Sequence, residues 1–145
     1  MTKEKFLYVT YIRSTQEKVW DALINPAVTQ LYWNHHNVSD WKPGSVWNHQ
    51  RCDGSGKIDI TGKVLETSPP HRLVISWADP DDTSRFSRVT FEIEPTNQGV
   101  KLTVTHDELE AGSSMLRGIS RGWPMVLSSL KTLLETGNAI DLSKF

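Results

Sequence analysis

Three residues at alternate positions, Trp47, His49 and Arg51, combine an indole, an imidazole and a guanidinium. Alternate residues of an extended strand point to the same face of a sheet. Such a row suits a pocket that holds an apolar body with an anionic head group. The alternative is that the row faces solvent and that Val46, on the opposite face, points inward.

A second candidate group contains Trp77 and Arg85. Trp77 continues the alternation of Leu73 and Ile75, so we expect it to point inward, where it either lines a cavity or fills the core. Arg85 continues the alternation of Val89 and enters the cavity from its end, ready for a carboxylate or phosphate. The alternative is that Arg85 is exposed or pairs with an aspartate in the segment 79–82.

His106 continues the apolar stripe of Val100, Leu102 and Val104. An inward histidine in such a stripe is typical of a hydrogen-bonded core residue. Because the pKa of imidazole lies near neutrality, His106 also fits a proton carrier if a substrate lies beside it.

Several other chemistries lack a complete motif. His35, His36 and His49 match no zinc-ligand spacing, so we expect no metal site. The segment 54–56 is too short for a phosphate-binding loop, and no histidine is placed to activate Cys52, which we expect to be an inert thiol. The sequence therefore indicates no cofactor, and the catalytic residues of any enzyme stay unknown.

The composition narrows the class of protein further. The 145 residues fit one domain, 1–145, with a net charge of −1 and a single cysteine. A nearly neutral chain lacks the clustered cations that nucleic acid requires. We also expect no membrane insertion, because no apolar stretch approaches bilayer length. The lone cysteine and the polar start of the chain favour a cytoplasmic location.

The elements that position these residues begin with a strand at 6–13. The segment Ser14–Glu17 resembles a capping box and predicts a helix whose apolar face includes Val19, Trp20 and Leu23. Asn25 and Pro26 end this helix, and Pro26 opens a second short one at 27–32. We therefore expect two short helices after the first strand.

The period of the pattern then changes to two. Turn signals separate five further predicted strands, at 46–51, 57–67, 73–77, 85–94 and 100–106. The short turns between them require antiparallel pairing. Gly62 lies inside one of these strands and predicts a bulge or a close approach of another part of the chain.

The last predicted element is a long amphipathic helix. Apolar residues recur at three- and four-residue spacing from Met115 to Leu134, and Gly137 is placed as a C-cap. Pro124 lies inside this stretch and predicts a kink, or a fresh start near 122–123. A curved sheet of about six to seven strands around this helix gives an α+β fold with space for a pocket between them.

Several segments, taken in order, resemble a known family. They are 14–23, 40–45, 64–66 with 69–70, 88–92, 102–106 and, most specifically, 122–131 with 134–137. They resemble the START-like (SRPBCC) superfamily and, within it, homologues of the activator of heat-shock protein 90 ATPase. The resemblance implies a helix-grip fold with an internal cavity. Members of the superfamily bind lipids, plant metabolites or polyketides, and some are cyclases.

The leading hypothesis is therefore a domain that binds a small apolar or aromatic molecule between the sheet and the C-terminal helix. The predicted ligand-binding residues are Trp33, Trp47, His49, Arg51, Trp77, Arg85, Phe91, His106, Met115, Ile119 and Met125. Trp33 is expected to be a gate at the cavity mouth. One alternative is a cyclase or hydrolase that uses the same cavity. Another is a protein-binding module, with a chaperone or a second copy of the chain as partner.

Overall fold

The computed structural model describes residues 2–145 and contains one antiparallel sheet of seven strands with three helices. The elements, in chain order, are β1 (Lys3–Ile12), α1 (Gln16–Ile24), α2 (Pro26–Trp33), β2 (His35–Ser39), β3 (Val46–Arg51), β4 (Ile58–Ser68), β5 (Arg72–Asp79), β6 (Asp82–Thr96), β7 (Gly99–Glu110), α3 (Ser114–Thr136) and a 3₁₀ turn, η1 (Leu142–Lys144). The strands lie in the order β1-β7-β6-β5-β4-β3-β2, so β5 is central.

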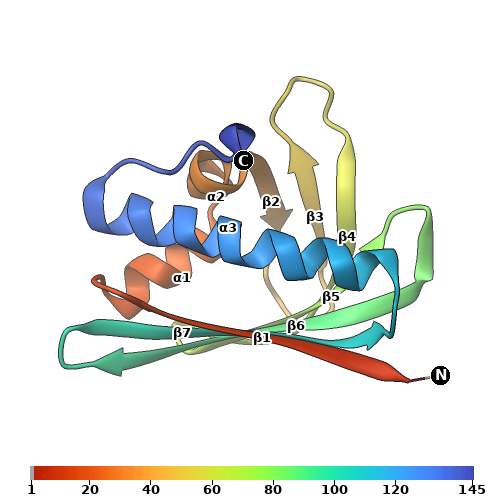
Figure 1. Ribbon diagram of the computed structural model, residues 1–145, viewed down its shortest axis with the longest axis horizontal. Helices are drawn as coiled ribbons and strands as arrows, with labels where there is room; N and C mark the ends of the chain where they lie inside the picture. Colours follow the sequence, from red (N-terminus) through yellow and green to blue (C-terminus); the bar gives the residue numbers. More distant parts are fainter. Residues whose placement is uncertain (1) are drawn as a thin grey trace.

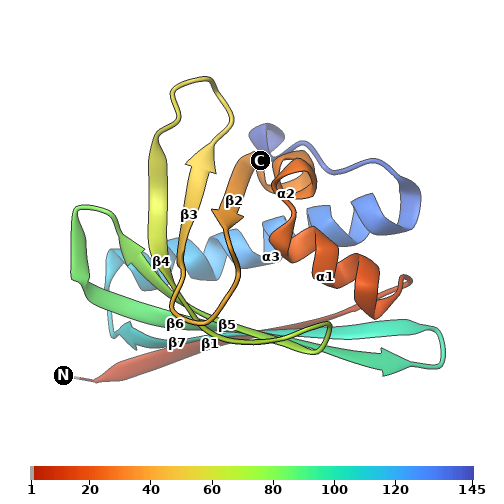
Figure 2. The ribbon, with the colours of Figure 1, turned by 180° about the vertical axis from the view of Figure 1, so that it is seen from behind.

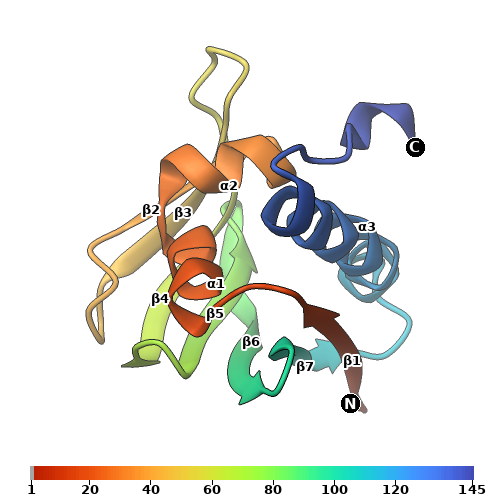
Figure 3. The same ribbon diagram turned by 90° about the vertical axis from the view of Figure 1, so that its left-hand side faces the viewer.

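The sheet bends strongly around the C-terminal helix. Strands β1, β6 and β7 run beneath α3, whereas β2, β3 and β4 stand nearly upright beside it (Figure 1). The view from behind shows β2 and β3 in front of α3 (Figure 2). Seen from the end, α3 lies along the concave side of the sheet, with α1 and α2 nearby (Figure 3). The predicted α+β helix-grip fold is confirmed.

The two short helices follow the first strand as predicted, with a different first cap. Thr15, not Ser14, is the N-cap of α1 and accepts a hydrogen bond from the Lys18 amide at 3.2 Å. The Ser14 amide instead donates to the Ile12 carbonyl at 2.9 Å in a tight turn, which delays the helix by one residue. The predicted capping box is therefore wrong. Asn25 ends α1 and caps α2 through the Ala27 amide.

The five strands predicted after the short helices are all present, and β2 is an addition. It pairs with β3 at the edge of the sheet, with His35 opposite Arg51 and Ser39 opposite Trp47. Its sequence, His-His-Asn-Val-Ser, has one aliphatic residue and therefore no apolar alternation. Pairing with β3, rather than local pattern, makes this segment a strand.

Gly62 of β4 permits a close approach between its two neighbouring strands. A Cβ atom at this position would run into the Ser76 carbonyl and lie 2.6 Å from Trp47 Nε1. The Trp47 indole uses the space to donate to that carbonyl at 2.7 Å, from β3 across β4 to β5. The predicted close approach is confirmed.

Helix α3 runs without interruption through Pro124. Its N-cap, Ser113, accepts from the Leu116 amide at 3.1 Å, and Gly137 adopts φ of +87° and donates to the Leu133 carbonyl at 2.8 Å. The alternative of a fresh start at 122–123 is wrong. Trp123 and Val126 are buried on either side of Pro124, and this packing holds the helix across the hydrogen bond that proline removes.

Candidate functional site

Aromatic rings fill the middle of the concave face around Trp77 of the central strand. The Trp77 ring is surrounded by five others with centroids 5.3–6.4 Å away, and Phe91 packs edge-on against one of them; the five are Trp33, Trp47, His49, His106 and Trp123. The structure thus brings together six of the predicted site residues, as a packed cluster.

The row at 47–51 points inward, as the pocket interpretation requires. Trp47 and His49 are buried, whereas Val46 is 53% exposed, so the solvent-facing alternative is wrong. His49 Nδ1 lies 2.5 Å from Asn37 Oδ1, and its ring stacks on His35 at 3.8 Å. Burial, followed by the charge of His35, lowers the pKa of His49 to about 3, so its imidazole is neutral at pH 7.

Arg51, at the end of the same row, already has an anionic partner. Its Nε lies 3.0 and 2.8 Å from the two carboxylate oxygens of Asp59. Asp59 also accepts from His35 Nε2 at 2.8 Å. These hydrogen bonds, with that from Arg51 the largest cause, lower the pKa of Asp59 to about 2. Arg51 is therefore paired through Nε, and its side chain is 42% exposed. We call His35, Asn37, His49, Arg51 and Asp59 the polar cluster.

His106 is completely buried and forms hydrogen bonds through both ring nitrogens. Trp123 Nε1 lies 3.0 Å from Nδ1, and Ser87 Oγ lies 2.7 Å from Nε2. An indole N–H only donates, so Nδ1 is the acceptor and the proton of the neutral ring is on Nε2, which donates to Ser87. Burial lowers the pKa of His106 to about 4, although Asp107 opposes the shift.

This tautomer decides what the Ser87–His106 pair can do chemically. A histidine activates a serine nucleophile by accepting its proton, which requires a free electron pair on the nitrogen that faces the hydroxyl. Here Nε2 carries a proton, and Trp123 offers no acceptor to hold a proton on Nδ1. The pair therefore fits a buried hydrogen-bond network better than a hydrolase dyad.

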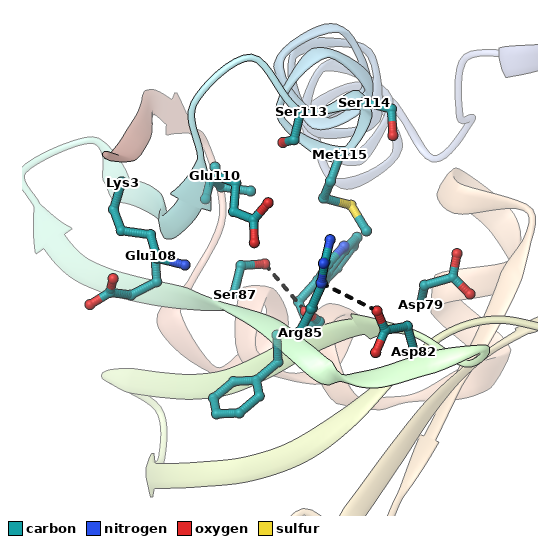
Figure 4. A pocket seen from close by; sticks show the side chains of 13 residues that line it. Lys3, Asp79, Asp82, Arg85, Ser87, Glu108, Glu110, Ser113, Ser114 and Met115 are labelled. Carbon is teal, nitrogen blue, oxygen red and sulfur yellow. Dashed lines mark hydrogen bonds and ion pairs between the residues drawn. The ribbon is translucent and has the colours of Figure 1, made fainter. Parts of the chain in front are cut away.

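A cavity of about 340 Å³ opens beside the aromatic cluster, between the N-terminal end of α3 and strands β5, β6 and β7. Its apolar walls are Trp77, Leu109 and Met115. Met115 points from α3 across the cavity toward Arg85, with Ser113 and Ser114 beside it (Figure 4). Of the predicted site residues, Trp77, Arg85 and Met115 line this cavity.

The other predicted residues lie elsewhere. Phe91 and Ile119 are buried in the core, and Met125 is half-buried on α3, away from the cavity lining. Trp33 is half-buried against Trp77 and Trp123. Trp33 does not line the cavity at the N-terminal end of α3, so its role as a gate stays a prediction.

Charged residues surround the opening of the cavity. The charged side chains that line the cavity are four carboxylates and two cations (Figure 4). The carboxylates are Asp79, Asp82, Glu108 and Glu110, and the cations are Lys3 and Arg85. Arg85 is 72% exposed and lies 3.5 Å from Asp82, which confirms the aspartate-paired alternative for this residue. The opening is therefore acidic, and its one ion pair between lining side chains is solvent-exposed and weak.

A change of register in β7 shapes this end of the sheet. Glu108 adopts φ of +59°, so His106 and Leu109, three residues apart, both point inward. Continued alternation after His106 would place the Glu108 and Glu110 carboxylates inside, which is costly. That conflict is the sequence signal that could have predicted the bulge.

A second cavity, of about 380 Å³, lies near the other end of β1. Residues that line it form hydrogen bonds with one another: Lys131 Nζ donates to the Tyr11 carbonyl at 2.6 Å and to Glu135 at 2.8 Å. Within residues 2–145, no group of three or more His, Cys, Asp or Glu side chains is arranged to hold a metal ion. In the same range, no helix is long and apolar enough to cross a membrane.

Comparisons with known proteins agree with this architecture. The fold matches protein MLL2253 from Mesorhizobium loti, with a TM-score of 0.77, 24% identity, and coverage of 90% of this chain and 96% of that chain. It matches the Aha1 dimer from Colwellia psychrerythraea, with a TM-score of 0.75, 20% identity, and coverage of 92% and 98%. It also matches an HSP90 activator from Plasmodium falciparum, with a TM-score of 0.74, 23% identity, and coverage of 90% and 95%.

Identities this low show a shared fold alone. A search of curated proteins found no significant match. A sequence model of one family does match, however, over residues 13–135, which is most of the chain. The chain therefore belongs to the family of activator of Hsp90 ATPase homolog 1-like proteins.

Proposed function

We propose that this protein binds a small apolar or aromatic molecule in the cavity between the sheet and the N-terminal end of α3. The observation that carries the proposal is the cavity itself, whose volume of about 340 Å³ lies within the range of small-molecule sites. One wall is the Trp77 ring, which offers a flat apolar surface. The opposite wall includes Met115, whose unbranched side chain adapts to ligands of different shape.

The packing of the aromatic cluster favours a ligand site at the N-terminal end of α3 rather than one over the middle of the sheet. Trp47 and Trp123 are nearly inaccessible, so a ligand there would have to displace whole rings. At the N-terminal end of α3, a ligand has only to move flexible or exposed side chains such as Met115 and Arg85. We therefore assign binding to Trp77, Leu109 and Met115.

A cavity-filling substitution tests this proposal. Met115→Trp places an indole in the cavity and is expected to weaken binding of 2-ethylnaphthalene at least about tenfold, measured by fluorescence titration. Met125→Trp is the matched control, because Met125 is also a half-buried methionine of α3 but does not line the cavity. Equal affinity of wild type and Met115→Trp, with Met125→Trp unchanged, rules the cavity out as the binding site.

A second candidate function, self-association, rests on the edge strand β1. The strand β1 lies at one edge of the sheet, so a second strand can pair with its free backbone groups. Three apolar side chains also alternate along its outer face and are exposed: Leu7 (56%), Val9 (40%) and Tyr11 (59%). The Colwellia relative is a dimer. We propose that two copies of this chain pair through β1.

Sedimentation velocity tests this dimer. Wild type is expected to sediment as a dimer and Leu7→Lys as a monomer, because charge on an edge strand opposes pairing. Leu65→Lys is the control, since Leu65 is 49% exposed on β4, inside the sheet. A monomeric wild type, or a Leu7→Lys variant that stays dimeric, contradicts the proposal.

A free and exposed Cys52 suits a reducing compartment. We propose a cytoplasmic location on this basis. Fractionation of cells that express the chain at native level tests it, and recovery with the soluble cytoplasmic fraction is the expected result.

A further inference from the structure

We infer that the ligand is a neutral aromatic carbonyl compound, whose oxygen accepts hydrogen bonds from Trp77 Nε1 and Ser87 Oγ. This inference rests on the proposed ligand-binding function and deepens it. It assigns a chemical class and an orientation to the ligand: the aromatic body lies along the Trp77 wall and the carbonyl oxygen points to the inner end of the cavity.

The first observation is an unsatisfied donor. Trp77 is 94% buried, and its Nε1 is the one buried side-chain nitrogen or oxygen within residues 2–145 that has no hydrogen-bond partner. Its neighbours in the cluster are satisfied, because Trp47 donates to the Ser76 carbonyl and Trp123 donates to His106. Buried donors without partners are rare, and a ligand that accepts the hydrogen bond is one explanation for such a donor.

The second observation is that Ser87 is directly opposite Trp77. The two residues are register partners on β5 and β6, and both line the cavity. Ser87 Oγ accepts a hydrogen bond from His106 Nε2–H, so its own hydroxyl proton is directed elsewhere. That proton has only a long contact of 3.3 Å, to the Trp77 carbonyl, and a closer oxygen acceptor can take it.

The third observation is where an acceptor can come from. Five aromatic rings surround Trp77 on the protein side and offer no acceptor to its Nε1. Trp77 also lines the cavity, so a ligand held there is the nearest source of an acceptor from outside the chain. Nε1 itself is shielded from solvent, so a ligand oxygen reaches it when a lining side chain moves. Met115, which points into the cavity from α3, is flexible enough to do so.

The charge around the opening selects among acceptors. Four carboxylates and two cations line the cavity, an excess of two negative charges. A ligand carboxylate or phosphate would be repelled there, whereas a neutral carbonyl oxygen would not. The two donors and the acidic opening therefore favour a neutral ketone or amide over an anion and over a plain hydrocarbon.

Three naphthalene probes of similar size separate these possibilities. They are 2-acetylnaphthalene, 2-ethylnaphthalene and 2-naphthoate, titrated by fluorescence into wild type, Ser87→Ala and Trp77→Phe. Wild type is expected to bind the ketone about fivefold to tenfold more tightly than the hydrocarbon, and the naphthoate most weakly. Ser87→Ala and Trp77→Phe are each expected to lose most of the ketone preference, measured as the ratio of the ketone affinity to the hydrocarbon affinity within the same variant.

A second measurement does not depend on the folding of any variant. Indole N–H signals of the ¹⁵N-labelled wild type report each tryptophan separately. The Trp77 signal is expected to move downfield with the ketone and not with the hydrocarbon, because only the ketone forms the hydrogen bond. Ser87→Ala supplies the affinity comparison if Trp77→Phe does not fold.

The outcomes distinguish this inference from the proposed function. If wild type binds the ketone and the hydrocarbon equally, or binds naphthoate most tightly, the carbonyl inference is overturned and the cavity remains a ligand site. An unmoved Trp77 signal in the ketone complex also overturns it. If none of the three probes binds to wild type, both the inference and the proposed function fail.

Discussion

The two sides of the central strand β5 treat their polar groups differently. On the side of β2, β3 and β4, the polar cluster is closed: Arg51 and His35 share Asp59, and His49 pairs with Asn37. On the side of β6, β7 and α3, a cavity remains. The Trp77 donor there has no partner among the described residues, and the Ser87 hydroxyl makes only one long hydrogen bond as a donor.

This difference teaches how similar residue types acquire different roles. Histidine, arginine and aspartate occur on both sides, and on the β2–β4 side they satisfy one another. Groups that satisfy one another stabilise a fold and leave nothing for a ligand. Groups whose partners come from outside the chain are the better candidates for binding, whatever their residue type.

The largest expected effect is on the pH dependence of the free energy of unfolding. Each side of β5 contains one buried neutral histidine, and both histidines contribute to this dependence. Burial lowers the pKa of His49 to about 3 and that of His106 to about 4. Between pH 6.5 and 4 the unfolded chain takes up protons on these residues and the folded chain does not. The contribution of each histidine to the free energy of unfolding is thus fully present above pH 6.5. It falls by about 2–3 kcal/mol for each histidine as the pH decreases toward 4.

Urea denaturation at pH 7 and pH 4.5 measures this loss. His106→Gln is expected to remove roughly half of the difference in free energy of unfolding, and His49→Gln the other half. A pH dependence that both variants leave unchanged means that neither imidazole is held neutral by burial.

The next largest effect is expected at Gly62, which lets Trp47 reach the Ser76 carbonyl. Gly62→Ala is expected to lower the free energy of unfolding by about 3 kcal/mol, because the new methyl group collides with the β5 backbone. Gly118→Ala is the matched control, since a Cβ there meets open space inside α3, and it is expected to stabilise by about 0.5–1 kcal/mol. Equal losses from the two variants would argue against a tight contact at Gly62.

The smallest effect is expected at Asp59 of the polar cluster. Its hydrogen bonds with Arg51 and His35 lower its pKa from 3.8 to about 2, so its contribution is present above pH 4 and is lost as the pH falls to 2. Because the pair is partly exposed, we expect Asp59→Asn to cost about 1 kcal/mol at pH 7. The variant should also lose less stability than wild type between pH 4 and 2. Acid titration monitored by tryptophan fluorescence measures this difference.

Ligand affinity provides a control for the whole comparison. The polar cluster does not line the cavity, so Asp59→Asn is expected to leave the affinity for 2-acetylnaphthalene unchanged. A loss of affinity in this variant comparable to that in Ser87→Ala would mean that the two sides of β5 are not separate in function.

Much of the fold could be predicted from local patterns. The alternation at 100–106 and the three- and four-residue spacing from Met115 to Leu134 each bury one face, and burial of that face decides strand or helix. The sequence did not predict β2, because this segment is a strand through its pairing with β3 and not through an apolar alternation. Thr15 rather than Ser14 is the helix cap, because the Ser14 amide forms a tight turn with the Ile12 carbonyl.

Less of the candidate site could be predicted. The alternation correctly indicated that Trp77 and His106 point inward, and it placed Trp47 and His49 on one face without deciding which face that is. It could not indicate that their rings pack together and leave the cavity at one end, because packing depends on distances between strands that are far apart in sequence. The bulge at Glu108 and the exposure of Arg85 likewise depend on those neighbours.

The sequence by itself thus determined most of the strands and helices and which side chains share a face, since both follow from local periodicity. Only the tertiary structure decided which polar groups find partners. The Asp59 carboxylate reaches Arg51 and the Trp123 indole reaches His106, but no acceptor within residues 2–145 reaches the Trp77 indole. The physical reason is that a hydrogen bond requires two groups within about 3 Å, and that distance is set by the packed sheet and helix together.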